Sequence, residues 1–557
     1  MIPETNQPAN TRRRLRRRRV IIASAAAGVL AVSVAVITIA TTSGSNSRSG
    51  TLSDLVIDGC YVQAQANCPR VNWSYADLTG RNLWRAHLEY ANLTNANLNG
   101  ATLTETFLNS ATLTGVRSGN IIGQTNSLPT GWKILIGYLI GPGANLTNVN
   151  LAGVDLTGVN LAGATLTGLR SGGITGTPTA LPTFWSLAVG YLIGPGANLI
   201  GANLDGADLR SATLSGAISG GITGTPATLP PGCRLVNGYL VGQGANLINA
   251  DLTGTDLSGI NLGGANLTGA TLTGATLTDV ISGGIIGTPA ALPTGWVLVN
   301  RYLIGPGANL RYANLTGANL TGATLTNATL TNATLTNATL TNADLTNANL
   351  TGAYLTNANL TGATLTGVIS GSIIGTPSAL PTSWSVVNRY LIGPSANLTN
   401  ADLRSANLTN ADLTNANLTG VISGGITGTP ATLPTGWVLG NGYLIGPGAN
   451  LTNANLTNAN LTGANLTNAN LSGVRSGSIT GTPATLPTGW VLANGYLVGP
   501  GANLTNANLT GATLAGVISG GIIGTPATLP TGWLLVNGYL IGPGANLTNA
   551  NLTNANL

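Results

Sequence analysis

Few side chains in this sequence have the chemistry for catalysis or metal binding. Only 6% of the 557 residues are charged, and there is one histidine, His87, with three cysteines, Cys60, Cys68 and Cys233. A metal site or a general base needs several such groups at defined spacings, and RNLWRAHLEYANL around His87 offers none. The acids are scattered singly. We therefore predict no catalytic residue, no metal site, no cofactor and no enzymatic activity, and interpret His87 as a solvated side chain.

The cysteines divide into a close pair and a single residue. Cys60 and Cys68 lie eight residues apart in the segment 52–72, which is less repetitive than the sequence after it. Outside the cytoplasm such a pair more often forms a disulfide than a metal site. We predict a disulfide within an N-terminal cap. Cys233 has no obvious partner, so it is either a buried free thiol or an intermolecular link.

Tryptophan recurs at one position of a longer repeated unit that reads SGGIIGTPATLPTGWVLVNGYLIGPGANL in its commonest form. An array of indole rings outside a cell could stack on the sugar rings of a wall glycan. Tryptophan is equally a good packing residue in β-hairpins, and we favour packing. In the third copy Cys233 replaces the tryptophan. The candidate glycan or partner contacts are Trp132, Trp185, Trp296, Trp384, Trp437, Trp490 and Trp533.

Eight copies of this unit occur, and the spacing between their closing leucines always leaves a remainder of three on division by five. The unit therefore has a fixed length, about 28 residues, and we expect it to leave and rejoin the surrounding repeat at a fixed geometry. WVLVNGYLIG predicts a hairpin around Asn-Gly, with Val536 opposite Tyr539 and Leu535 opposite Leu540. Asn300-Arg301 and Asn388-Arg389 depart from this pattern, because arginine is unfavourable at positive φ.

The rest of the chain repeats every five residues. Leucine falls at Leu310 and at every fifth position through Leu365, with alanine almost always two places before it. Neither a helix nor a strand has this period. A short extended edge would point Ala and Leu to one side, and the following Thr-Gly or Thr-Asn would form a corner. The pattern predicts a coil with Ala and Leu inside, too narrow for β-branched or aromatic residues at the Ala position.

The tandem A(N/D)LXX pentads resemble the pentapeptide-repeat proteins over most of the chain after about residue 72. The resemblance implies an all-β fold, a right-handed quadrilateral β-helix with four pentads per coil. We expect this solenoid over 73–557, with eight inserted hairpin-like units of about 28 residues. The fold alone does not define a function.

An apolar segment lies near the N-terminus. Residues 1–19 end in TRRRLRRRR, and residues 20–40 carry no charge. At 1.5 Å per residue, a helix of that length spans roughly 30 Å, enough to cross a bilayer. The arginines predict a cytoplasmic tail, a single-pass transmembrane helix over 20–40, a flexible linker over 41–51, and a repeat array outside the cytoplasm. The alternative is a signal peptide that is cleaved, with the array secreted.

Charge limits the choice of partner. Residues 1–40 hold seven arginines and one glutamate, while residues 41–557 hold 14 Lys and Arg and 14 Asp and Glu. A neutral array has no field that would attract DNA or imitate it, so we expect no nucleic-acid partner. Some members of the resembled family mimic DNA and inhibit gyrase by means of an acidic surface, which this sequence lacks.

These observations predict a membrane-anchored, extracytoplasmic scaffold or protein-interaction module at a bacterial cell surface. The partner is an unknown protein or glycan, and the membrane is contacted through residues 20–40. Cell-wall glycan binding through the tryptophans and tyrosines of the longer units, and DNA-mimic regulation of gyrase, are the alternatives. The chain stops in mid-pentad at Leu557. An uncapped coil exposes backbone edges, so a homodimer through the C-terminal coil is also expected.

Overall fold

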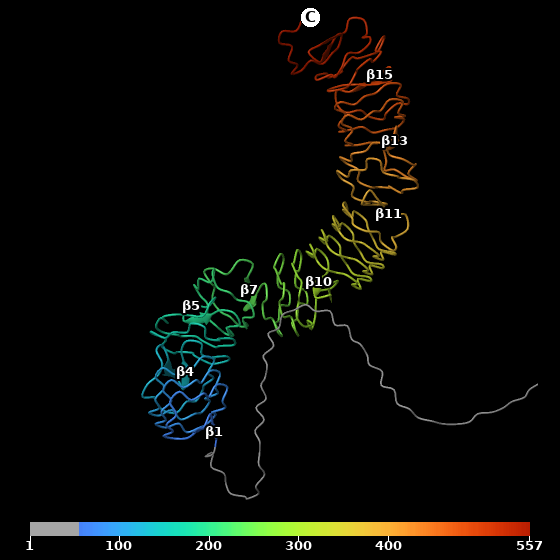
Figure 1. The fold of residues 1–557 in the computed structure, drawn as a ribbon. Helices are drawn as coiled ribbons and strands as arrows, with labels where there is room; N and C mark the ends of the chain where they lie inside the picture. The colour runs from blue at the N-terminus through green and yellow to red at the C-terminus, as the bar shows by residue number, and fades with distance from the viewer. Residues whose placement is uncertain (1–54, 557) are drawn as a thin grey trace, which may run out of the picture. The chain divides into compact units, whose positions relative to one another are not determined.

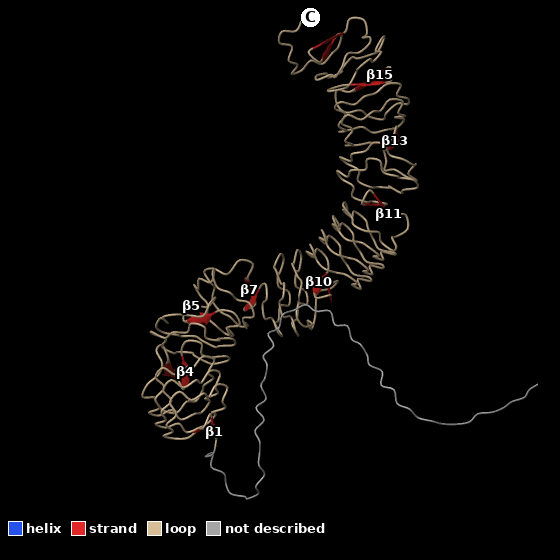
Figure 2. Ribbon diagram, viewed as in Figure 1, coloured by secondary structure: helices blue, strands red, loops and turns tan. Residues whose placement is uncertain are grey.

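The computed structural model describes residues 55–556, and within this range the chain forms β-bridges, short strands and turns with no helix (Figures 1 and 2). The colour gradient of Figure 1 follows the coils as they stack in sequence order. The predicted tail, transmembrane helix and linker lie outside the described residues, as does the start of the predicted cap at 52–54.

Each regular coil is closed by parallel bridges between residues that lie four pentads apart. These bridges join Asn309 to Thr329, Thr329 to Asn349, and Asn349 to Ile369. The backbone N–H of Leu310 donates to the carbonyl of Thr329 over 2.8 Å, and the N–H of Thr329 donates to Ala308 over 2.9 Å. Four pentads thus make one coil, as expected for a four-sided solenoid, and every side adds a rung to a ladder along the stack.

The interior is filled as the period predicts. In the pentads around Ala333 and Leu335 the inward side chains are fully buried. One expectation is wrong: Val154, Val159 and Ile260 occupy the alanine position and are also buried. The interior therefore admits β-branched side chains where neighbouring coils leave room.

The corners explain the preference for Asn-Leu-Thr. The Asn314 side-chain oxygen accepts the backbone N–H of Thr316 at 3.2 Å and its hydroxyl at 2.7 Å. The last residue of a pentad has positive φ, as at Asn327 with 59°. Asparagine and glycine tolerate that conformation better than other residues, which accounts for the Thr-Asn and Thr-Gly ends.

Each of the eight longer units contains one hairpin. The hairpins are β3 (Lys133–Leu135) with β4 (Tyr138–Ile140), β5 (Ser186–Ala188) with β6 (Tyr191–Ile193), β7 (Arg234–Val236) with β8 (Tyr239–Val241), β9 (Val297–Val299) with β10 (Tyr302–Ile304), β11 (Ser385–Val387) with β12 (Tyr390–Ile392), β13 (Val438–Gly440) with β14 (Tyr443–Ile445), β15 (Val491–Ala493) with β16 (Tyr496–Val498), and β17 (Leu534–Val536) with β18 (Tyr539–Ile541). The register is the predicted one, with Val536 opposite Tyr539 and Leu535 opposite Leu540.

The longer unit does not leave the coil over its whole length. Ile286 and Ala291 still bridge Asn266 and Thr271 in the coil before, and Ile281 bridges Asn309, which follows the hairpin. Three sides therefore keep the ordinary pairing, and only the fourth side opens into the hairpin β9–β10. The unit is a coil lengthened on one side, because Ile286 and Ala291 supply the same backbone rungs as ordinary pentads.

The Asn-Arg copies form the same hairpin turn as the Asn-Gly copies. Arg301 and Arg389 both have φ of 64°. The Arg301 guanidinium donates to the carbonyls of Ile285 and Gly284 at 3.0 and 2.9 Å. Arg389 donates equally to Ile373 and Ser372, each at 3.1 Å. These charge-assisted bonds offset the strain of a non-glycine residue at positive φ.

The first coil is covered by a small hairpin, β1 (Val56–Ile57) with β2 (Cys60–Tyr61). Cys60 and Cys68 form a disulfide, with Cα atoms 6.1 Å apart. The fully buried Trp73 donates its indole N–H to the carbonyl of Ile57 at 3.1 Å. This segment ties the chain to the first solenoid coil.

Candidate functional site

One side of the first coils carries side chains unlike those of the rest of the array. Asn67, His87, Phe107 and Ser127 form consecutive rungs of one ladder. The rings of His87 and Phe107 stack at 4.4 Å between centroids, with 10° between their planes. His87 is half-exposed and its Nδ1 lies 2.9 Å from the carboxylate of Glu89. The expectation that His87 is solvated is correct in part, but it has two side-chain neighbours.

The corners on either side of this ladder extend the same surface. At one corner the Arg85 guanidinium lies 4.6 Å from the centroid of Trp84 and 2.5 Å from the carboxylate of Glu105. At the other, Arg70 lies 5.2 Å from the ring centroid of Tyr90. We call this surface the N-terminal patch, comprising Arg70, Trp84, Arg85, His87, Glu89, Tyr90, Glu105 and Phe107.

The N-terminal patch has a composition typical of protein interfaces. Tyrosine, tryptophan, phenylalanine and arginine are enriched where proteins bind one another, whereas most outward positions of the array are threonine or asparagine. Its two arginines are balanced by two glutamates, so its charge is close to neutral. The cation–π and ion-pair contacts hold the long side chains in place, which lowers the entropy that binding would remove.

The patch could have been found in the sequence. Arg70 and Tyr90, Arg85 and Glu105, and His87 and Phe107 are each separated by the length of one coil, four pentads. Written in rows of that length, the first coils would have shown these pairs as neighbours. The five-residue period alone does not show them, because it gives the direction of a side chain and not its neighbour in the next coil.

The repeated tryptophans pack into the hairpin units. Trp132, Trp296 and Trp533 are buried, and Trp185, Trp384, Trp437 and Trp490 are half-buried. Each ring lies against a glycine at the end of its hairpin. A Cβ added to Gly305, for example, would lie 2.1 Å from the Trp296 ring. The indole faces are therefore in contact with the hairpin, which supports the packing interpretation over glycan stacking.

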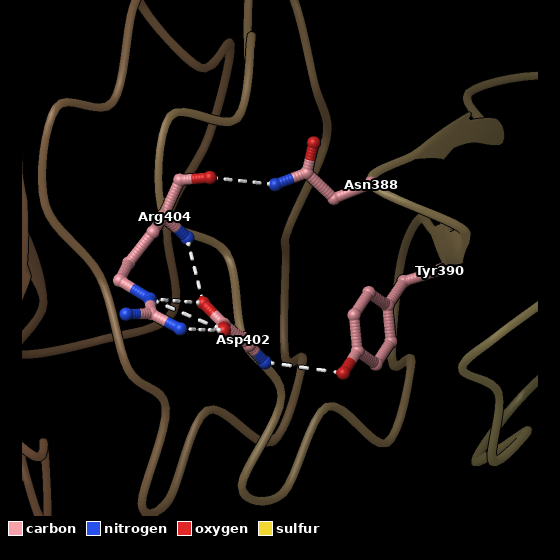
Figure 3. Close-up of polar contacts among 4 residues, drawn as sticks. All are labelled: Asn388, Tyr390, Asp402 and Arg404. Carbon is pink, nitrogen blue, oxygen red and sulfur yellow. Dashed lines mark hydrogen bonds and ion pairs between the residues drawn. The ribbon is translucent and has the colours of Figure 1, made fainter.

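Each hairpin is bonded to the coil before it and most are bonded to the coil after it. The N–H of Leu391 in β12 donates to the hydroxyl of Ser370 at 2.9 Å. Figure 3 shows the other side, where the Tyr390 hydroxyl accepts the N–H of Asp402 at 3.1 Å and the Asn388 amide donates to the Arg404 carbonyl at 2.8 Å. The hairpin thus lies between two coils, not against a neighbouring hairpin.

A hollow of about 780 Å³ beside this hairpin is lined by Arg389, Tyr390, Asp402 and Arg404, among others. The Arg404 guanidinium pairs with the Asp402 carboxylate at 2.5 Å (Figure 3), and this bond lowers the pKa of Asp402. Arg389 is bonded to backbone carbonyls. Both guanidinium groups are therefore already bonded within the protein, which makes this hollow a weaker candidate for a binding site than the N-terminal patch.

Cys233 is a free, half-buried thiol, and burial raises its pKa to about 11. Within residues 55–556, no group of three or more His, Cys, Asp or Glu side chains could hold a metal ion. The same part of the chain has no helix long and apolar enough to span a membrane.

Comparison with known proteins gives one family. The model described as "Pentapeptide repeats (8 copies)" matches residues 76–115, 142–170, 196–218, 244–281, 307–342, 335–369, 395–422, 447–475 and 500–518. The segments between these matches contain the hairpins from β3–β4 to β15–β16, and β17–β18 follows the last match. No curated protein matches the chain.

Two solved structures show similarity at low identity. The first is HetL, a pentapeptide repeat protein involved in heterocyst differentiation regulation from the cyanobacterium Nostoc sp. strain PCC 7120, with 24% identity over 55% of this chain and 86% of that chain and a TM-score of 0.11. The second is QnrB1, a plasmid-mediated fluoroquinolone resistance protein, with 18% identity over 35% of this chain and 86% of that chain and a TM-score of 0.12. These values carry no information on the function of this chain.

Proposed function

The chain belongs to the pentapeptide repeat family, and from this premise we propose that it is a non-enzymatic scaffold that binds a partner protein outside the cytoplasm. The family fold is of the protein-interaction kind. The proposal assigns partner binding to the N-terminal patch and membrane attachment to residues 20–40.

The observation that carries the proposal is the clustering of exposed aromatic and ion-paired side chains on the first coils. Tyr90 is 56% exposed, lies under Arg70, and follows Glu89, whose carboxylate pairs with His87. Tyrosine and arginine held in place by neighbours are typical anchors of protein interfaces. The long array after it presents mostly small polar side chains, which distinguishes the patch from the rest of the array.

Export is supported by two sequence features. Seven arginines precede the uncharged residues 20–40, which is the charge asymmetry of a segment whose N-terminus stays in the cytoplasm. The Cys60–Cys68 disulfide is a bond that persists in oxidising compartments. The structure favours neither alternative function, since the hairpin tryptophans pack against glycine and the array is close to neutral.

A photo-cross-linking amino acid tests the proposal. Placed at Tyr90 in the full-length chain in its own cells, it should give a discrete adduct with one partner protein, and the adduct should be lost when Trp84 and Arg85 are both changed to alanine. The matched control is Tyr312, which is 71% exposed at a corner of the middle coils. Equal adducts from both positions, or none from Tyr90, would rule out the patch as the binding surface.

A further inference from the structure

The third hairpin unit lacks the ring that the other seven contain. Cys233 stands where they have tryptophan. Two nearby residues also differ in the third unit: Pro231 stands where the other seven units have threonine, and Gln243 stands where they have proline.

One leucine is more exposed in the third unit than in the other seven. In the other seven, the leucine of the last ATL or ANL pentad before the unit is only 1–2% exposed. Its counterpart Leu214 is half-buried. These seven leucines are Leu113, Leu166, Leu277, Leu365, Leu418, Leu471 and Leu514.

The glycine that admits the ring is kept in the third unit. In the seven tryptophan units a Cβ on this glycine would lie 2.1–2.3 Å from the indole ring, so only glycine fits. Gly242 is the equivalent residue, although no ring faces it. A Cβ there would meet the carbonyl oxygen of Gly232 at 3.2 Å and the Cα of Cys233 at 3.3 Å.

A cavity of about 90 Å³ lies at this position, and its lining is Leu214, Ser215, Pro230, Pro231, Gly232, Cys233, Leu240, Gly242, Gln243 and Ala245. Pro231 is exposed, so the cavity is reached from the surface. Its walls are mainly leucine, proline and glycine faces, against which a flat apolar ring packs well. Apolar walls of this composition can accept aromatic molecules.

We propose that this cavity is a binding site for a planar aromatic ring of the indole class, supplied either by a free small molecule or by a tryptophan side chain of another polypeptide. The Cys233 thiol, which is neutral at physiological pH because burial raises its pKa, forms one uncharged wall. The site does not depend on the proposed scaffold function, and the isolated full-length chain suffices to test it.

Indole is the first probe. Added to the full-length chain, it should raise the Tm in a saturable manner and slow modification of Cys233 by a thiol reagent. Cys233 is the thiol to follow without reductant, since Cys60 and Cys68 are joined. Cys233→Trp should raise the Tm without indole and abolish the further rise with indole. N-acetyltryptophanamide distinguishes the sources: if it binds, a side chain on a polypeptide fits; if only free indole binds, the ligand is a small molecule.

A second variant keeps the test decisive if Cys233→Trp does not fold. Trp296→Cys combined with Thr294→Pro and Pro306→Gln copies the lining of the third unit into the fourth and should double the number of indole molecules bound per chain in equilibrium dialysis. An unchanged number, an equal rise of Tm in wild type and Cys233→Trp, or a rate of Cys233 modification independent of indole would each overturn the proposal.

Discussion

Aspartate and asparagine share the outward position of the pentads but differ in their response to acid. The Asp344 carboxylate accepts the hydroxyl of Thr346 at 2.6 Å and its backbone N–H at 3.0 Å. The hydroxyl bond is the main cause of the lowered pKa of Asp344. At Asp208 the Arg210 guanidinium and the Thr228 hydroxyl lower the pKa to about 2. The structure thus favours the ionised form at these corners.

The consequence is loss of stability in acid. A carboxylate whose pKa is lowered by folding stabilises the folded state at pH values above its unfolded pKa of 3.8. For Asp208 that stabilisation is lost as the pH falls towards 2. The free energy of unfolding, followed by circular dichroism in urea, should be flat above about pH 5 and fall below about pH 4. Changing the eight aspartates with lowered pKa to asparagine should flatten this fall; an unchanged profile would contradict the prediction. They are Asp77, Asp155, Asp208, Asp251, Asp256, Asp344, Asp402 and Asp412.

The hairpin is positioned by a small set of side chains that recur at fixed places. In the fourth unit the Ser282 hydroxyl accepts the N–H of Leu303 at 3.0 Å, and the Tyr302 hydroxyl accepts the N–H of Asn314 at 3.2 Å. The Asn300 amide donates to Thr316 at 3.2 Å. These bonds join the hairpin to the coils on both sides, so the longer unit does not interrupt the solenoid.

Glycine at the end of the hairpin is required only where the ring is present. Gly305→Ala would force a Cβ into Trp296, at a site without positive φ, and should reduce the local opening free energy by about 1–3 kcal/mol. Gly242→Ala, in the unit without tryptophan, should reduce it less. Hydrogen exchange at the amides of Leu303 and Leu240 measures the two effects locally. Equal losses would show that the contact with the ring is not the cause.

The chain as a whole combines a distinctive N-terminal end with a long uniform array. The charges within residues 55–556 balance, at 13 of each sign. Repeat proteins are stabilised mainly by contacts between neighbouring coils, so changes at one unit should remain local. This allows the patch, the hairpins and the third-unit cavity to be altered separately in one molecule.

The proposed function requires the repeat array to lie on the outer side of the membrane. Tyr312→Cys puts a thiol at a highly exposed corner of the array. In intact cells a membrane-impermeant thiol reagent should label it fully, because residues 20–40 are proposed to leave the array outside. Cys233 is the internal comparison and should react more slowly, being half-buried. Labelling of Tyr312→Cys only after lysis would place the array in the cytoplasm and contradict the proposed export.

The sequence by itself determined the solenoid and the hairpin register. The period of five, with Leu and Ala at fixed places, predicts which side chains face inward. Asn-Gly between two apolar runs predicts that Val536 pairs with Tyr539, as the structure has it. Both are local properties of the chain, so no knowledge of distant residues was needed. The coil length of four pentads came from the family resemblance, and the parallel bridges confirm it.

The period of five did not show which residues meet across coils, and the tertiary structure did. It joined His87 to Phe107 and Arg85 to Glu105 in the N-terminal patch, kept Ile286 and Ala291 on the coil, and gave Arg301 carbonyl partners that offset its positive φ. It also showed that Leu214, in the unit without an indole, is more exposed than its seven counterparts. These contacts join residues on different coils or on opposite sides of a hairpin unit. A repeat of five gives the direction of each side chain. It does not show which residue of the next coil lies beside it.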